Sequence, residues 1–126
     1  MRVRILTAGP HSDHPATRLL GRGLALKLIR AGGQVYEYQP AMIHAKLMIV
    51  DKIWVVAGST NFDHRSFELN DEVNVAFFDD ELAGRIQMDF EADLANSIRL
   101  TTDRIRHESL GGKLMEHLSW LLRREQ

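Results

Sequence analysis

The 126-residue chain contains no cysteine and no long apolar run. Without cysteine it can form neither a disulfide nor a thiolate metal site, so a reducing compartment is allowed. No apolar stretch approaches the roughly 18 residues of a membrane-spanning helix, and the N-terminal one is too short for a secretory signal. The formal net charge of −1 supplies no overall positive field to attract nucleic acid. The remaining composition is that of an ordinary soluble globular protein. Nucleic acid is therefore a less favoured partner for this chain.

Strand-like and helix-like segments alternate along the chain, without a repeat or a linker. The strand patterns cover residues 2–8, 34–39, 42–50, 53–57 and 73–78. Three helical patterns are also present. The first ends near Ala31, the second starts at Asp79 or Asp80, and the third runs from about 113 to 124. The second of these helices has an apolar stripe of Leu82, Ile86, Phe90, Leu94 and Ile98. We therefore expect a single α/β domain over residues 1–126, with a mixed β-sheet sandwiched by helices.

The stretch 43–51, IHAKLMIVD, places a histidine and a lysine inside an apolar strand pattern. Residues i and i+2 of a strand share a face, so His44 and Lys46 point the same way. The opposite face is uniformly apolar and is expected to supply the core (Ile43, Ala45, Leu47, Ile49). An edge strand that merely exposes His44 and Lys46 to solvent is the alternative to a functional site.

The segment 58–61, GSTN, makes the functional interpretation the stronger one. A turn at residues 51–52 returns the chain, so this segment can lie beside His44 and Lys46. The assembled imidazole, ammonium, hydroxyl and carboxamide groups suit an anionic tetrahedral ligand such as a phosphodiester. Lys46 would supply positive charge, and Ser59 and Asn61 would donate to the non-bridging oxygens.

Two spaced motifs together resemble those of the phospholipase D superfamily. The first is HxKxxxxD, here His44, Lys46 and Asp51, and the second is GSxN, here residues 58–61. Three longer runs are similar to the C-terminal half of bacterial cardiolipin synthases, namely GPHSDHP (9–15), YEYQP (36–40) and GSTNFDHRSFELNDE (58–72). The resemblance extends over about residues 3–94. It implies one phospholipase D-like half-domain that takes part in phosphatidyl or phosphodiester transfer.

The resemblance also implies a phosphohistidine intermediate. In this superfamily one motif histidine attacks phosphorus, and a second motif histidine protonates the leaving alcohol. A single imidazole cannot do both in an in-line displacement, and this chain has one HxKxxxxD. We therefore expect a second motif-bearing half, either the N-terminal half of a longer chain or a second copy in a homodimer. Whether His44 is the nucleophile or the general acid stays open.

Several further residues receive expected roles. Glu72 would orient the catalytic imidazole, as the resemblance implies for an acidic residue just after the loop, and an ordinary strand-end charge is its alternative. Asp51 would lie roughly 15 Å from the phosphorus, given the rise of a strand, and is expected to act at the turn. Possible substrate contacts are His11, Arg65 and Asn70. No metal ion and no other cofactor is expected.

A phosphatidyl substrate would require access to a bilayer. The segment 113–125 can form an amphipathic helix that lies on a membrane surface, on the core or on the missing half. We expect a soluble chain that acts peripherally at the cytoplasmic side of a bacterial inner membrane. Phosphatidylglycerol would be both donor and acceptor, and water as acceptor would make the site a phospholipase D hydrolase. The alternatives are a single-motif homodimeric phosphodiesterase or nuclease, and an isolated half-domain that is inactive alone.

Overall fold

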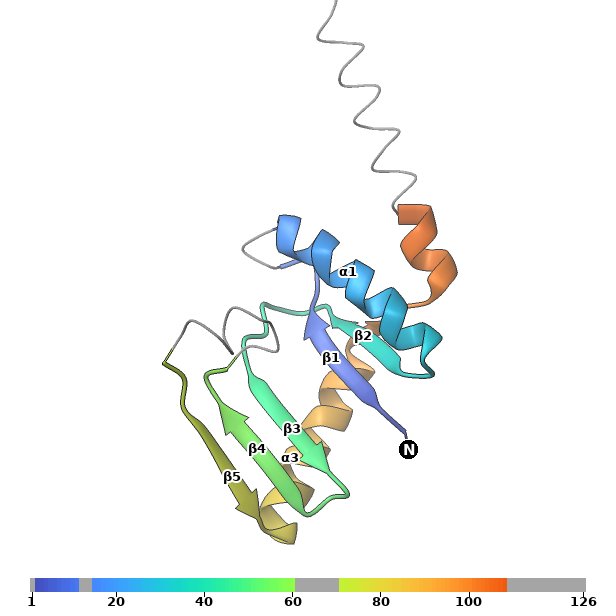
Figure 1. The fold of residues 1–126 in the computed structure, drawn as a ribbon. Helices are drawn as coiled ribbons and strands as arrows, with labels where there is room; N and C mark the ends of the chain where they lie inside the picture. The colour runs from blue at the N-terminus through green and yellow to red at the C-terminus, as the bar shows by residue number, and fades with distance from the viewer. Residues whose placement is uncertain (1, 12–14, 61–70, 109–126) are drawn as a thin grey trace, which may run out of the picture.

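The structure, a computed structural model, describes residues 2–11, 15–60 and 71–108 (Figure 1). Its elements are β1 (Arg4–Ala8), α1 (Pro15–Arg30), β2 (Gln34–Tyr38), β3 (Lys46–Val50), β4 (Trp54–Gly58), β5 (Asn74–Phe78), α3 (Asp80–Ala95) and β6 (Ser97–Arg99). Residues 102–108 are also helical. This alternation of strands and helices confirms the expected α/β class.

The first sheet has the strand order β1-β2-β6 and is mixed. β1 runs parallel to β2, and β6 runs antiparallel to it. A parallel pair needs a crossover connection, which α1 provides. The buried core of this part combines Val35 of β2 with Ala25 of α1 and with Leu100 and Ile105. The first sheet is therefore packed against both α1 and the helical residues 102–108.

A buried ion-pair network lies beside this core. The Arg22 guanidinium on α1 donates from Nε and Nη2 to Glu37 Oε1 of β2, each at 3.4 Å. Arg22 Nη1 also pairs with the carboxylate of Glu108. Because Arg22 and Glu37 are both buried, their pair links α1 to β2 away from bulk water. The pair with the exposed Glu108 links α1 to the helical residues 102–108.

The second sheet has the order β3-β4-β5 and is entirely antiparallel. The β3–β4 connection is a tight turn in which Asp51 and Lys52 have positive φ of 51° and 61°, and Ile53 N donates to Val50 O at 3.2 Å. Two positive φ values are typical of the type I′ turn, whose twist matches that of the flanking strands. α3 lies behind this sheet in the view of Figure 1.

The helix α3 connects the two sheets. It contacts β4 of the second sheet and β2 and β6 of the first. Val55 of β4 and Ala83 of α3 are fully buried. At its other end, Arg4 of β1 forms a two-pronged pair with Glu91, with N–O distances of 2.8 and 2.5 Å. This hydrogen bonding lowers the pKa of Glu91 to about 2, and it raises the pKa of Arg4.

The structure departs from the sequence expectations in four respects. The strands form two three-stranded sheets and not one, and the short strand β6 was not expected. Ile98 lies in β6 and not on the α3 stripe, because Asn96 ends the helix: its backbone N–H donates to the carbonyls of Asp93 and Leu94. β3 begins at Lys46 and not at 42, because its partner Gly58 is the last residue of β4.

The remaining helix predictions have different outcomes. α3 begins as expected, since Asp79 is its N-cap and accepts from Leu82 N at 2.9 Å. The helix expected at 113–124 lies outside the described residues. In the part of the chain that the structure does describe, no helix has the length and apolarity to cross a bilayer.

Candidate active site at one end of the second sheet

The two motif segments meet at one end of the second sheet. Lys46 is the first residue of β3 and pairs with Gly58, the last residue of β4, which in turn pairs with Asn74, the first residue of β5. The hairpin therefore brings Lys46 beside Gly58, the first residue of GSxN, as the sequence predicts. His44 lies two residues before β3 and is exposed.

Lys46 is held by the backbone of the same motif. Its Nζ donates to the carbonyl oxygen of His44 at 2.9 Å. An ammonium carries three N–H donors, so two remain for a ligand. Lys46 is half-buried, which places its charge partly out of bulk water without the full cost of desolvation. The bond also ties the backbone at His44 to the start of β3.

Ser59 follows β4 and is bound to the segment that leads into β5. Its backbone N–H donates to Val73 O at 3.0 Å, and its Oγ accepts from Val73 N at 3.1 Å. The Ser59 hydroxyl donates its own proton to the Glu72 carboxylate. Residues 72 and 73 thus hold Ser59 through three separate hydrogen bonds.

Glu72 was expected to orient the His44 imidazole, and here its carboxylate receives the Ser59 hydroxyl. No hydrogen bond joins Glu72 to His44 among the described residues. Both residues belong to the same end of the sheet, because Glu72 comes two residues before Asn74 of β5. Orientation of His44 by Glu72 stays a prediction.

Gly58 allows a close approach that no other residue would permit. A Cβ atom at this position would lie 2.1 Å from Asn74 Oδ1 and 2.3 Å from Val73 O. Asn74 passes over this glycine and donates from Nδ2 to the buried Thr60 Oγ1 at 2.6 Å. The sequence did not point to Asn74, and it offered Thr60 only as one more hydroxyl near the site. The available signal was spacing, since Glu72 and Asn74 are two apart on one face.

Asp51 lies at the opposite end of β3. It is exposed, it occupies the β3–β4 turn, and it forms no ion pair with another described residue. Five residues of strand separate it from Lys46, or roughly 16 Å. This position agrees with a role in the turn and is distant from the other motif residues.

The other expected site residues are placed only in part. His11 is exposed and follows β1 of the first sheet. Asn61, Arg65 and Asn70 lie outside the described residues, so their positions stay predictions. Nowhere in the described ranges do three or more histidine, aspartate or glutamate side chains gather in a group that could hold a metal ion.

Comparison with known proteins agrees with this geometry. Residues 1–94 match the family described as cardiolipin synthase, phospholipase D-like domain. The chain belongs to this family. That membership confirms the superfamily to which the two spaced motifs pointed.

Individual relatives give the same result. The chain is 37% identical over 110 residues to a cardiolipin synthase of Oceanobacillus iheyensis, covering 87% of this chain and 23% of the relative. It is 41% identical over 101 residues to cardiolipin synthase A of Pseudomonas aeruginosa, covering 80% of this chain and 20% of the relative. The chain therefore spans about a fifth of the length of the curated relatives that it matches.

A solved structure shares the fold. Nuc from Salmonella typhimurium, a phospholipase D family member, superposes with a TM-score of 0.66 at 19% sequence identity. The match covers 79% of this chain and 64% of that one. At this identity the likeness concerns the fold alone, and it confirms the phospholipase D-like architecture.

Proposed function

We infer that this chain is one motif-bearing half of a cardiolipin synthase-like phosphatidyltransferase. The observation that carries the proposal is the pairing of Lys46 with Gly58, which joins the HxK and GSxN motifs at one end of the second sheet. In a chain of this family, such a cluster supports binding of a phosphodiester. Phosphatidylglycerol is the proposed donor and acceptor.

The proposed reaction has two displacements at one phosphorus. In the first, a histidine nitrogen attacks phosphorus, the bond to the leaving glycerol oxygen breaks, and a second histidine gives that oxygen a proton. In the second, the hydroxyl of another phosphatidylglycerol attacks, the P–N bond breaks, and the second histidine takes the hydroxyl proton. Histidine suits both roles because its ordinary pKa lies near neutral pH. His44 is one of the two histidines.

The neighbouring side chains stabilise charge on the phosphoryl oxygens. Lys46 offers the two N–H donors that its bond to the His44 carbonyl leaves over. Ser59 donates to Glu72, so its hydroxyl reaches a phosphate only by turning from that carboxylate. Asn61 is proposed as a further donor, and Asp51 as a residue of the turn.

The second histidine is proposed to come from another motif-bearing half. The chain spans about a fifth of the cardiolipin synthases that it matches, which leaves ample room for such a half in a longer protein. Access to a phosphatidyl substrate requires a peripheral position at a membrane, and the amphipathic segment 113–125 is the proposed contact.

A homodimeric single-motif phosphodiesterase is the second candidate. The observation in its favour is that this fold also occurs on a chain of comparable length, since the match covers 64% of Nuc. In that arrangement two copies of His44 would supply both imidazoles across a two-fold axis. An isolated half-domain without activity is the remaining alternative.

Solution mass and turnover together test these proposals. We expect sedimentation to show a monomer that turns over phosphatidylglycerol only when a complementing motif-bearing half is added. Activity that rises with a dimer of this chain alone would favour the homodimeric phosphodiesterase. Turnover by a strict monomer would contradict the requirement for two histidines.

A further inference from the structure

We propose that Asn74 is a positioning residue for the phosphate-binding turn, here Ser59 and Thr60 after β4, and that it acts through Thr60. The inference rests on the proposed function, because it concerns how the same site is held in shape. Asn74 lies outside both motifs, and among the described residues no hydrogen bond joins it to His44 or Lys46. Its effect on a phosphate must therefore pass through Ser59 and Thr60.

The geometry of Asn74 is fixed on two sides. As the register partner of Gly58, it has its Oδ1 within 2.1 Å of where a Cβ at position 58 would stand. Its Nδ2 donates to Thr60 Oγ1 at 2.6 Å. The missing side chain of Gly58 therefore opens the path by which the amide reaches Thr60.

Thr60 is the anchor of this contact. It is 8% exposed, whereas Asn74 itself is exposed, so the amide reaches from the surface to a buried hydroxyl. A buried hydroxyl without a partner costs more than the bond itself contributes, which makes this contact hard to give up. The bond fixes the residue immediately after Ser59.

Three consecutive residues, 72–74, at the entry to β5 thus hold Ser59 and Thr60. Glu72 accepts from the Ser59 hydroxyl, Val73 exchanges two hydrogen bonds with Ser59, and Asn74 donates to Thr60. We infer that the Asn74–Thr60 bond sets the position of the turn relative to Lys46. Loss of this one bond would let the turn shift while the strands stay paired.

The chemistry of the asparagine amide explains the choice of residue. An aspartate of the same shape would lack the N–H donor and would add a negative charge where a phosphate should bind. Alanine would remove the donor without adding charge. Thr60→Val removes the acceptor with little change of shape, and Thr60→Ser keeps it.

Binding of inorganic phosphate by the chain, followed by NMR at the Lys46 and Ser59 amides, tests the inference. We expect Thr60→Val and Asn74→Ala to weaken phosphate binding by about tenfold, the size of effect that one hydrogen bond can have. Thr60→Ser should bind within about twofold of the wild type. Hydrogen exchange at the Ser59 amide should be faster in the two disruptive variants and unchanged in Thr60→Ser.

The outcomes separate this inference from the proposed function. Wild-type affinity in both Thr60→Val and Asn74→Ala would overturn the positioning role and leave the phosphate site intact. If Thr60→Val does not fold, Asn74→Ala decides alone, because Asn74 is exposed. No phosphate binding by the wild type, at concentrations where Lys46→Ala also shows none, would overturn the proposed function and the inference with it.

Discussion

The two sheets of this molecule have three strands each and differ in what they bury. In the first sheet, Val35 and Glu37 of the central strand are buried, and helices pack against them. In the second, Val55 is the one buried residue among the described strands β3 to β5, and every residue of β5 is exposed. The first sheet concentrates stability, and the second presents polar groups at an accessible end.

The largest effect on stability is expected at the buried ion pairs of the first sheet. Arg22→Ala removes the guanidinium that bonds the buried Glu37 carboxylate and also the Glu108 carboxylate, which keeps its pair with Arg104. We expect the free energy of unfolding to fall by about 3–5 kcal/mol. Urea denaturation of Arg22→Ala beside Arg85→Ala, whose partner Glu81 is on the surface, checks this. Equal losses in the two variants would contradict the comparison.

Gly58→Ala is expected to have the next largest effect, at the site itself. The new Cβ would meet Asn74 Oδ1 and Val73 O well inside contact distance, so the strands must move apart. We expect a loss of about 1–3 kcal/mol in unfolding free energy, together with weaker phosphate binding. Gly84→Ala in α3 is the matched control, since nothing lies within 4 Å of its Cβ position. That helical substitution should instead be stabilising by about 0.5–1 kcal/mol.

The same substitution, valine to alanine, made once in each sheet compares how much burial stabilises the two sheets. Val35→Ala on β2 removes two buried methyl groups from the core, where the side chain is 2% exposed, and should cost about 2 kcal/mol. Val75→Ala on β5, where the side chain is 48% exposed, should stay within about 0.5 kcal/mol. Thermal and urea unfolding measure both. A larger loss for Val75→Ala would mean that β5 is covered in solution.

The smallest expected change in stability is the one caused by lowering the pH. The pKa of Glu91 is lowered to about 2, mainly by the Arg4 guanidinium. A carboxyl with a depressed folded-state pKa contributes stability above its ordinary pKa and loses it as the pH falls toward the depressed value. We expect the stability difference between wild type and Glu91→Gln to shrink from pH 5.5 to pH 3. Glu81→Gln is the surface control, and a difference that grows on acidification would contradict the sign.

Local patterns in the sequence predict much of this architecture. Alternating apolar residues located all five longer strands to within a few residues, and Asp79 marked the start of α3. The spacing of His44, Lys46 and GSTN predicted a hairpin that joins the two motifs, and the register confirms it. These features depend on short-range periodicity and on turn chemistry, which a single sequence contains.

The structural features that the sequence does not predict depend on contacts between segments far apart in the chain. β6 has three residues and exists because it pairs with β2, so it has almost no pattern of its own. The bond from Ser59 to Glu72 and that from Asn74 to Thr60 each join residues more than ten positions apart. Arg22 and Glu37 are 15 positions apart, so no local pattern in the sequence predicts their ion pair. Such contacts form because the fold brings distant residues together, and neither composition nor local pattern shows this.

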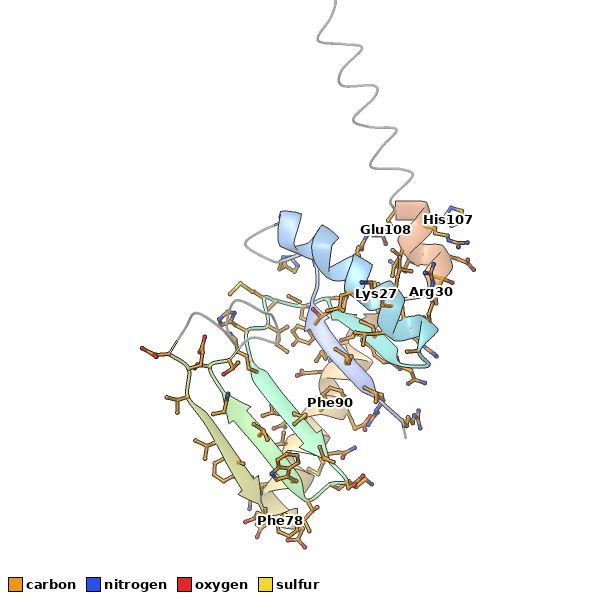
Figure 2. The ribbon with its side chains drawn as sticks, in the orientation of Figure 1. Lys27, Arg30, Phe78, Phe90, His107 and Glu108 are labelled. Carbon is orange, nitrogen blue, oxygen red and sulfur yellow. The ribbon has the colours of Figure 1, made fainter. Side chains whose placement is uncertain are left out.

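The central claim is that a phosphodiester reacts at the end of the second sheet where His44 and Lys46 lie. Its most direct test is phosphatidylglycerol turnover by the active assembly that contains this chain, compared between His44→Ala and His107→Ala. Both histidines are exposed, and His107 lies on the helical residues 102–108 beside the first sheet (Figure 2). We predict that His44→Ala lowers turnover by about a thousandfold or more, as expected when a nucleophile or general acid is removed, and that His107→Ala retains wild-type turnover. Turnover that survives in His44→Ala would contradict the account.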